Sequence, residues 1–395
     1  MSYIEKGSIE FRKTNIALFA GGFSTFAILY STQPLLPYLS KDFHISPATS
    51  SLSLSVTTIS LAVSLLIVAS LSEVLGRKPI MTFSMFSASL LAILTGFAPN
   101  FHSLLILRVL QGFALSGLSA IAMAYLSEEI EQNGLGVAMG IFISGNSLGG
   151  MFGRIIIGVF TDIFNWRVAL CVIGALSFAS SILFLIELPT SKHFKPRKLE
   201  ICNLFKSLLS HIKNPYLLSL FCIGFLLLGS FVSMYNYIGF QLIAPPYSLS
   251  QTLVSFIFIL YLMGTFSSTW MGGLADKHGQ QKVLLSALFI MFVGISITLS
   301  MSLVLKIIGI AVLTFGFFGA HSIASSWVGH FATHDKAQAA SLYLFFYYAG
   351  SSIGGTASGT FWTLYGWKGV AGVIMCFIIM ALMLLSRLSP KKLVL

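Results

Sequence analysis

The feature that most constrains this chain is a series of long apolar segments separated by short polar loops. Hydrophobic residues make up 56% of its 395 residues, and charged residues only 9%. A soluble domain carries about 25% charged residues, so this chain has too few charges to cover a water-facing surface. About 20 apolar residues in a helix match the ~30 Å hydrocarbon core of a bilayer. The sequence therefore predicts an all-α integral membrane protein.

Twelve segments are long enough to span a membrane. They lie at residues 14–39, 48–71, 79–98, 104–127, 135–161, 166–188, 215–243, 252–274, 281–300, 304–329, 337–361 and 367–388. An even number places both ends on one side, and 17 of the 23 Lys and Arg residues fall on that side. Because short cytoplasmic loops are enriched in Lys and Arg, we expect a multi-pass protein of the cell (inner) membrane with both termini cytoplasmic.

The charged and metal-binding residue types exclude several other classes of protein. The net charge of +11 comes from basic residues dispersed over short loops, so we expect no nucleic-acid partner. The four cysteines have no paired metal spacing, and neither a Walker A loop nor an H-E-x-x-H pattern is present. We therefore expect no bound metal, no cofactor and no enzymatic activity. A channel is a further alternative, against which the repeat of the two halves argues, and a non-transporting sensor is one that only flux data could exclude.

The two halves of the chain repeat one another. The segment ASLSEVLGRK at 69–78 aligns with GGLADKHGQQ at 272–281, at an offset of 203 residues. GNSLGG at 145–150 aligns with GSSIGG at 350–355, at an offset of 205 residues. Internal repeats in a polytopic protein indicate a transporter with its site between the halves. We expect two pseudo-symmetric six-helix bundles, at 1–188 and 215–395, joined by a basic cytoplasmic linker at 189–214 that lies on anionic lipid headgroups.

The repeated loops carry a motif that resembles the major facilitator superfamily signature G-x-x-x-D-R-x-G-R-K. The first copy has Glu73, Gly76 and Arg77, and the second has Asp276 and Gly279. The glycine permits a tight turn. The resemblance implies that these five residues latch the cytoplasmic side in one state, which is a gating role. The alternative is a loop whose charges only set topology.

Two further motifs extend the resemblance. Arg108 lies in LRVLQGF, which is similar to the family's R-x-x-Q-G pattern, and the resemblance associates this arginine with proton coupling. The fifth span resembles the family's antiporter signature, although Gly150 and Arg154 depart from it. Small residues permit close helix approach. The predicted helix-packing residues are Gly145, Gly149, Gly150, Gly153, Gly350 and Gly354.

Over its whole length the chain is similar to the YnfM-like group of arabinose or drug efflux permeases, a resemblance carried by YSTQPLLPYL at 30–39 and SLYLFFYYAGSS at 341–352. It implies the major facilitator fold. Polar and aromatic residues within spans are candidates for binding an uncharged or amphiphilic solute. The candidates are Gln33, Asn146, Tyr235, Asn236, Tyr261, His321 and Tyr347. Each could instead serve only in packing.

His321 is the best titratable candidate, because an imidazole changes charge near neutral pH. No Asp or Glu lies deep in a predicted span, whereas Arg108 and Arg154 both lie within spans. We therefore predict a monomeric antiporter that exports a small neutral or anionic solute by alternating access, with protons as the coupling ion and membrane lipids around it. The alternatives are multidrug efflux of lipophilic compounds, or a uniporter or importer without proton coupling.

Overall fold

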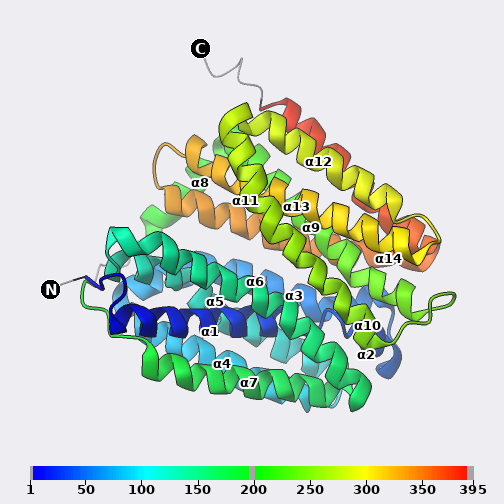
Figure 1. The fold of residues 1–395 in the computed structure, drawn as a ribbon, viewed down its shortest axis with the longest axis horizontal. Helices are drawn as coiled ribbons and strands as arrows, with labels where there is room; N and C mark the ends of the chain where they lie inside the picture. The colour runs from blue at the N-terminus through cyan, green and yellow to red at the C-terminus, as the bar shows by residue number, and fades with distance from the viewer. Residues whose placement is uncertain (1–2, 195–200, 389–395) are drawn as a thin grey trace. The chain divides into compact units, whose positions relative to one another are not determined.

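The computed structural model describes residues 3–194 and 201–388 and is almost wholly helical over these ranges (Figure 1). The one pairing of extended backbone within them is an isolated bridge between Ile4 and Ile130. The helices are α1 (Ile9–Leu29), α2 (Leu36–Asp42), α3 (Pro47–Leu75), α4 (Arg77–Gly96), α5 (Phe101–Glu129), α6 (Gln132–Ile163), α7 (Trp166–Glu187), α8 (Ile201–Lys213), α9 (Pro215–Ile243), α10 (Gln251–Phe256), the 3₁₀ helix η1 (Ile257–Leu260), α11 (Tyr261–His278), α12 (Gln280–Ile297), α13 (Leu303–Phe331) and α14 (Lys336–Ser386).

Ten helical stretches in the described part of the chain are long and apolar enough to cross a membrane. One of them, α14, is two helices that meet at Gly366, where φ is 58° and ψ is −143°. α14 therefore holds the last two predicted spans. α1 is a further helix of 21 residues, about 32 Å at 1.5 Å per residue. The predicted all-α membrane fold with about twelve spans is confirmed.

The first span is broken before it reaches its predicted end. α1 stops at Leu29, and the chain turns through residues 30–35 before α2 begins. Pro34 lies in this turn. Proline lacks an N–H group, and it disfavours helical backbone at the preceding residue, here Gln33. The break exposes the last carbonyl groups of α1 inside the predicted membrane region, where they need donors.

The contacts divide the chain into two compact units. Unit 1 contains residues 1–38, 56–199 and 251–256, and unit 2 contains residues 39–55, 200–250 and 257–395. In unit 1, α1 packs against α6 and α7, and α4 packs against α5 and α7. In unit 2, α9 packs along α14, and α13 packs against both α11 and α12.

Each unit includes a short segment from the other half of the sequence. The beginning of α3 groups with unit 2, where the Ser55 and Thr356 hydroxyl oxygens are 2.8 Å apart and the Ser352 hydroxyl donates to the Ser55 carbonyl. α10 groups with unit 1, where the Thr252 backbone N–H donates to the Asp162 carboxylate over 2.7 Å.

The division into bundles at 1–188 and 215–395 stays a prediction. α8 lies inside the predicted linker, whereas the linker residues Lys195, Arg197 and Lys198 lie outside the described residues.

Glycines bring α6 very close to α1. A Cβ atom added to Gly145 or Gly149 would lie 2.6 or 2.1 Å from the carbonyl oxygen of Phe19 or Phe23. A Cβ atom on Gly153 would lie 2.7 Å from the Ala27 Cα. In unit 2, Gly350 and Gly354 approach Phe225 and Gly229 of α9 in the same way. At Gly150 the nearest atom, 3.4 Å away, belongs to the Arg154 side chain instead.

Candidate functional site

Arg108 of α5 binds the broken end of α1. Its side chain is fully buried, and its guanidinium donates to the carbonyls of Ile28 and Leu29 over 3.0 and 2.7 Å. It also donates to the Gln111 side-chain oxygen over 2.7 Å. A cation at a helix C-terminus satisfies exposed carbonyl groups and interacts favourably with the helix dipole. Arg108 therefore faces the protein interior and stabilises the break in the first span.

Arg154 of α6 contacts the same break from another helix. Only 1% of its surface is exposed. Its Nε donates to the Gln33 side-chain oxygen over 2.8 Å, and its guanidinium carbon lies 4.1 Å from the centre of the Tyr30 ring. The guanidinium also donates to the Gly150 carbonyl. Two guanidinium groups, from α5 and α6, thus meet residues 28–33.

Asn146 also lies in unit 1, on the face of α6 that meets α1. Its side-chain oxygen has no hydrogen-bond partner among the described residues. That oxygen lies 2.4 Å from where a Cβ atom on Gly22 would stand, so Gly22 makes room for the amide. Asn146 and Gln33 are the two predicted substrate-binding residues that unit 1 contains.

In unit 2, four of the predicted substrate-binding residues belong to one group of contacting rings, which we call the aromatic cluster. Tyr235 contacts Tyr261 at 5.1 Å between ring centres, and its hydroxyl lies 2.9 Å from the Thr314 hydroxyl. His321 stacks on Tyr347 at 4.3 Å. The remaining members are Phe231, Phe258, Phe317, Phe318 and Tyr343, so that α9, η1, α11, α13 and α14 all contribute.

His321 makes a specific hydrogen bond within this cluster. Its Nδ1 lies 2.9 Å from the hydroxyl of Tyr343. The Asn236 side chain lies beside Gly355 of α14, since its amide nitrogen is 3.1 Å from where a Cβ atom on Gly355 would stand. Adjacent residues on a helix point in different directions, which is why Tyr235 and Asn236 separate.

The first copy of the loop motif forms an ion pair that the sequence did not identify. Arg77 contacts both carboxylate oxygens of Glu128, over 3.1 and 2.6 Å, and also the Ser72 hydroxyl. Gly76 has φ of 94°, a backbone conformation that glycine adopts readily. Lys78 donates to the Leu188 carbonyl. Glu73 is half-buried and has no ion-pair partner in the described part of the chain.

The second copy keeps the turn but not the ion pair. Gly279 has φ of 91°, close to that of Gly76. Asp276 is exposed, and within the ranges that the structure describes it forms no ion pair. The two copies therefore share backbone geometry and differ in side-chain contacts.

Several residues of these sites escaped prediction. Glu128 lies in the last turn of α5, and nothing in the sequence indicates that its side chain pairs with Arg77. Glu129 is also buried, and it accepts hydrogen bonds from the backbone N–H and the ring of His193. Phe231 and Phe317 are common apolar residues, and their stacking at 3.8 Å depends on how α9 and α13 pack.

Comparisons with known proteins agree with this architecture. The family model described as Major Facilitator Superfamily matches residues 18–243. The chain is 53% identical over 389 residues to an uncharacterized MFS-type transporter, YybF, of Bacillus subtilis strain 168, covering 98% of this chain and 96% of the relative. It is 46% identical over 389 residues to the inner membrane transport protein YnfM of Escherichia coli strain K12, covering 98% and 93%.

A solved structure shares the fold. It is that of a bacterial homolog to the human lysosomal transporter Spinster in an inward-facing and unoccupied conformation, with a TM-score of 0.77 at 14% identity. The match covers 95% of this chain and 96% of that chain.

The helical spans and the buried polar sites define a polytopic membrane carrier. The chain belongs to the Major Facilitator Superfamily, and its similarity to YybF and YnfM extends over almost its full length. The predicted resemblance to this family and to the YnfM-like group is confirmed, and the chain is a secondary transporter of the superfamily.

Proposed function

We propose that this transporter exports a small neutral or anionic solute in exchange for protons, by alternating access. We place it in the bacterial inner membrane as a monomer with both termini cytoplasmic. Support for the membrane comes from the name of its relative YnfM, an inner membrane transport protein. Support for the orientation comes from the distribution of Lys and Arg residues.

The proposed charge of the solute rests on one observation, the pair of buried guanidinium groups at the break in the first span. Arg108 and Arg154 are 0% and 1% exposed, and both contact residues 28–33. Charges interact strongly where water is excluded, so positive groups at this place repel a cation and attract an anion or a polar neutral group. This favours a neutral or anionic solute over a lipophilic cation.

His321 is the proposed proton-exchanging group. Its ring lies in the aromatic cluster beside Tyr347 and accepts from, or donates to, the Tyr343 hydroxyl. A tyrosine hydroxyl can bond either tautomer of a neutral imidazole, and it can still accept from the protonated ring. Arg108 acts on the same step in this proposal by holding the break in α1. The aromatic cluster also suits a lipophilic compound, which keeps multidrug efflux as the second candidate.

The remaining predicted residues have proposed roles in conformational change. The loop residues Glu73, Gly76, Arg77, Asp276 and Gly279 act as the cytoplasmic gate, and the Arg77–Glu128 pair supports this role in the first copy. The glycines of α6 and α14 allow close packing along which helices slide.

The test is to record internal pH in proteoliposomes while solutes are added outside. The panel contains neutral sugars, organic anions and lipophilic cations, tested on the wild type and on His321→Gln. We expect a pH change with one neutral or anionic class, and its loss in the variant while labelled solute still exchanges. A pH response to lipophilic cations alone would favour multidrug efflux. Solute uptake without any pH response would mean a uniporter, and His321 would lose its role.

A further inference from the structure

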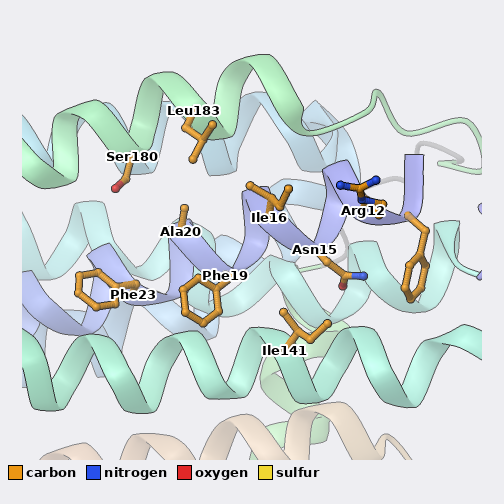
Figure 2. Close-up of a pocket in the computed structure, with 10 residues that line it drawn as sticks. Arg12, Asn15, Ile16, Phe19, Ala20, Phe23, Ile141, Ser180 and Leu183 are labelled. Atoms are coloured by element: carbon orange, nitrogen blue, oxygen red, sulfur yellow. The ribbon is translucent and has the colours of Figure 1, made fainter. Parts of the chain in front are cut away.

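A groove on the surface of unit 1 is not used by the proposed transport site. It runs between α1, α6 and α7 and has a volume of about 690 Å³ (Figure 2). Its floor is α1, with α7 on one side and α6 on the other. The groove is lined by Phe11, Arg12, Asn15, Ile16, Phe19, Ala20, Phe23, Ile141, Ser180 and Leu183.

The groove opens on a lipid-facing surface. Ile16 and Leu183 in its lining are 46% and 40% exposed, and the neighbouring α7 residues Ile182 and Ile186 are 43% and 68% exposed. In a membrane-spanning helix such exposed apolar side chains face acyl chains rather than water. From Phe11 to Phe23 the floor is about 18 Å long at 1.5 Å per residue. That length is close to the ~15 Å hydrocarbon thickness of one leaflet.

Two of the three polar side chains of the groove, Arg12 and Asn15, lie together at one end, and the third, Ser180 of α7, lies toward the other end. Figure 2 shows Arg12 and Asn15 at the end where α1 begins, with Phe19 and Phe23 farther along. Arg12 is exposed, and it can present its guanidinium to a ligand. Asn15 is only 7% exposed, and its side-chain oxygen has no hydrogen-bond partner in the described part of the chain.

An orphaned buried acceptor is costly unless a ligand supplies a donor. The Asn15 oxygen therefore indicates a headgroup that carries a hydroxyl or another N–H or O–H donor. Arg12 indicates a phosphate, because a guanidinium binds phosphate oxygens through paired hydrogen bonds. Lys6, six residues before Arg12, and Lys13, the next residue, add positive charge, which favours a lipid of net negative charge.

We propose that this groove binds one anionic phospholipid of the phosphatidylglycerol type. Arg12 holds the phosphate, Asn15 accepts a hydrogen bond from a headgroup hydroxyl, and one acyl chain lies along Phe19 and Phe23. With the predicted orientation, the lipid belongs to the cytoplasmic leaflet. The binding does not depend on the solute or on proton coupling, so it can fail or hold independently of the proposed transport function.

The test is native mass spectrometry of the purified full-length chain with added dioleoyl phosphatidylglycerol. Arg12→Gln should weaken lipid retention about tenfold, since a charge-assisted hydrogen bond is lost. Lys13→Gln is the matched control, because Lys13 is the next residue, is exposed and does not line the groove. Asn15→Leu should also weaken retention. Equal retention in Arg12→Gln and Lys13→Gln would overturn the site.

Two further arms test the lipid and the groove. Phosphatidylethanolamine with the same acyl chains should be retained about fivefold less, because it carries no net charge. Equal retention of both lipids would overturn the assignment of an anionic headgroup. Ala20→Trp, which fills the groove, should abolish retention, while Leu176→Trp on an exposed position of α7 outside the groove should not. Unchanged retention in Ala20→Trp would place the lipid elsewhere.

Discussion

Gly149 lies at the closest approach between α6 and α1. A Cβ atom there would be 2.1 Å from the Phe23 carbonyl oxygen and 2.5 Å from the Phe23 Cα. Both atoms belong to the backbone, so they cannot move aside as the end of a flexible side chain could. The same helix contains Gly140, at which an added Cβ atom would meet nothing within 4 Å.

We predict that Gly149→Ala destabilises the protein by about 1–3 kcal/mol, the usual cost of overpacking a close contact. Gly140→Ala is the matched control, and it should be neutral or slightly stabilising, because alanine has the better helix propensity. Thermal unfolding of the purified variants in detergent measures both effects. If the two variants unfold at the same temperature, the close approach of α6 to α1 does not require a glycine at position 149.

Arg108 illustrates what could and could not be predicted for a single residue. A charged residue inside a span is rare, and this alone indicated that its side chain faces the protein interior. Its partners could not be predicted, because the Ile28 and Leu29 carbonyls become available only where α1 ends. Pro34 signalled that break. Nothing in the sequence linked it to an arginine about 75 residues away.

At the scale of one element, α8 is held against the loop between α13 and α14. His211 of α8 stacks on His334 of the loop at 4.7 Å between ring centres. The Ser207 hydroxyl donates to the Asp335 carboxylate over 2.6 Å, and the Ser210 hydroxyl lies 3.0 Å from the His334 ring. Burial, and then the neighbouring His334, lower the pKa of His211, while Asp335 opposes this shift.

We predict that α8 detaches from this loop as the pH falls. A lowered pKa in the folded state means that docking is fully present above the ordinary histidine pKa of about 6.5 and is lost as the pH falls below it. The rate of backbone hydrogen exchange in residues 206–213, corrected for its intrinsic pH dependence, should therefore increase as the pH is lowered from about 7.5 to about 5.5.

His211→Gln should remove that pH dependence. His278→Gln changes an exposed histidine elsewhere in the same unit, and it should leave the pH dependence intact. Identical exchange of the His211→Gln variant and the wild type at both pH values would mean that another group controls the docking of α8.

At the scale of the whole molecule, hydropathy predicted the fold well but not the grouping of its segments. Long apolar helices are the structures that satisfy the backbone within lipid, so the number of spans follows from the sequence. The exchange of α10 and the first part of α3 between the units depends on tertiary contacts such as Asp162 with Thr252. The two residues of this contact are far apart in the chain, and neither belongs to a recognisable motif.

We predict that linking α3 to α14 stops transport. The hydroxyl oxygens of Ser55 and Thr356 are 2.8 Å apart, and α3 and α14 belong to different predicted bundles, which alternating access would move against each other. The experiment uses a background without the four native cysteines, into which Ser55→Cys and Thr356→Cys are introduced together. Treatment of this double variant with a short thiol-reactive cross-linker should abolish its transport activity. Each single variant, treated in the same way, is the control and should keep its activity.

Solute flux in proteoliposomes measures this effect. For a disulfide formed by oxidation of the double variant, a reductant should restore the flux. Undiminished flux in the fully cross-linked protein would show that these helices stay together throughout the transport cycle.

The way Arg108 binds the end of α1 has a consequence for synthesis of the chain. α1 includes Arg12, Lys13 and Asn15, and it is not among the ten stretches apolar enough to count as spans by hydropathy. The Ile28 carbonyl already accepts from the Ser31 N–H and hydroxyl, whereas the bond from Arg108 to the Leu29 carbonyl can form only when residue 108 has been translated. We expect nascent chains stopped at residue 100 to leave their first segment accessible to protease, and chains stopped at residue 190 to protect it. The first segment of this protein would then be held stably in the membrane only after its fourth span has left the ribosome.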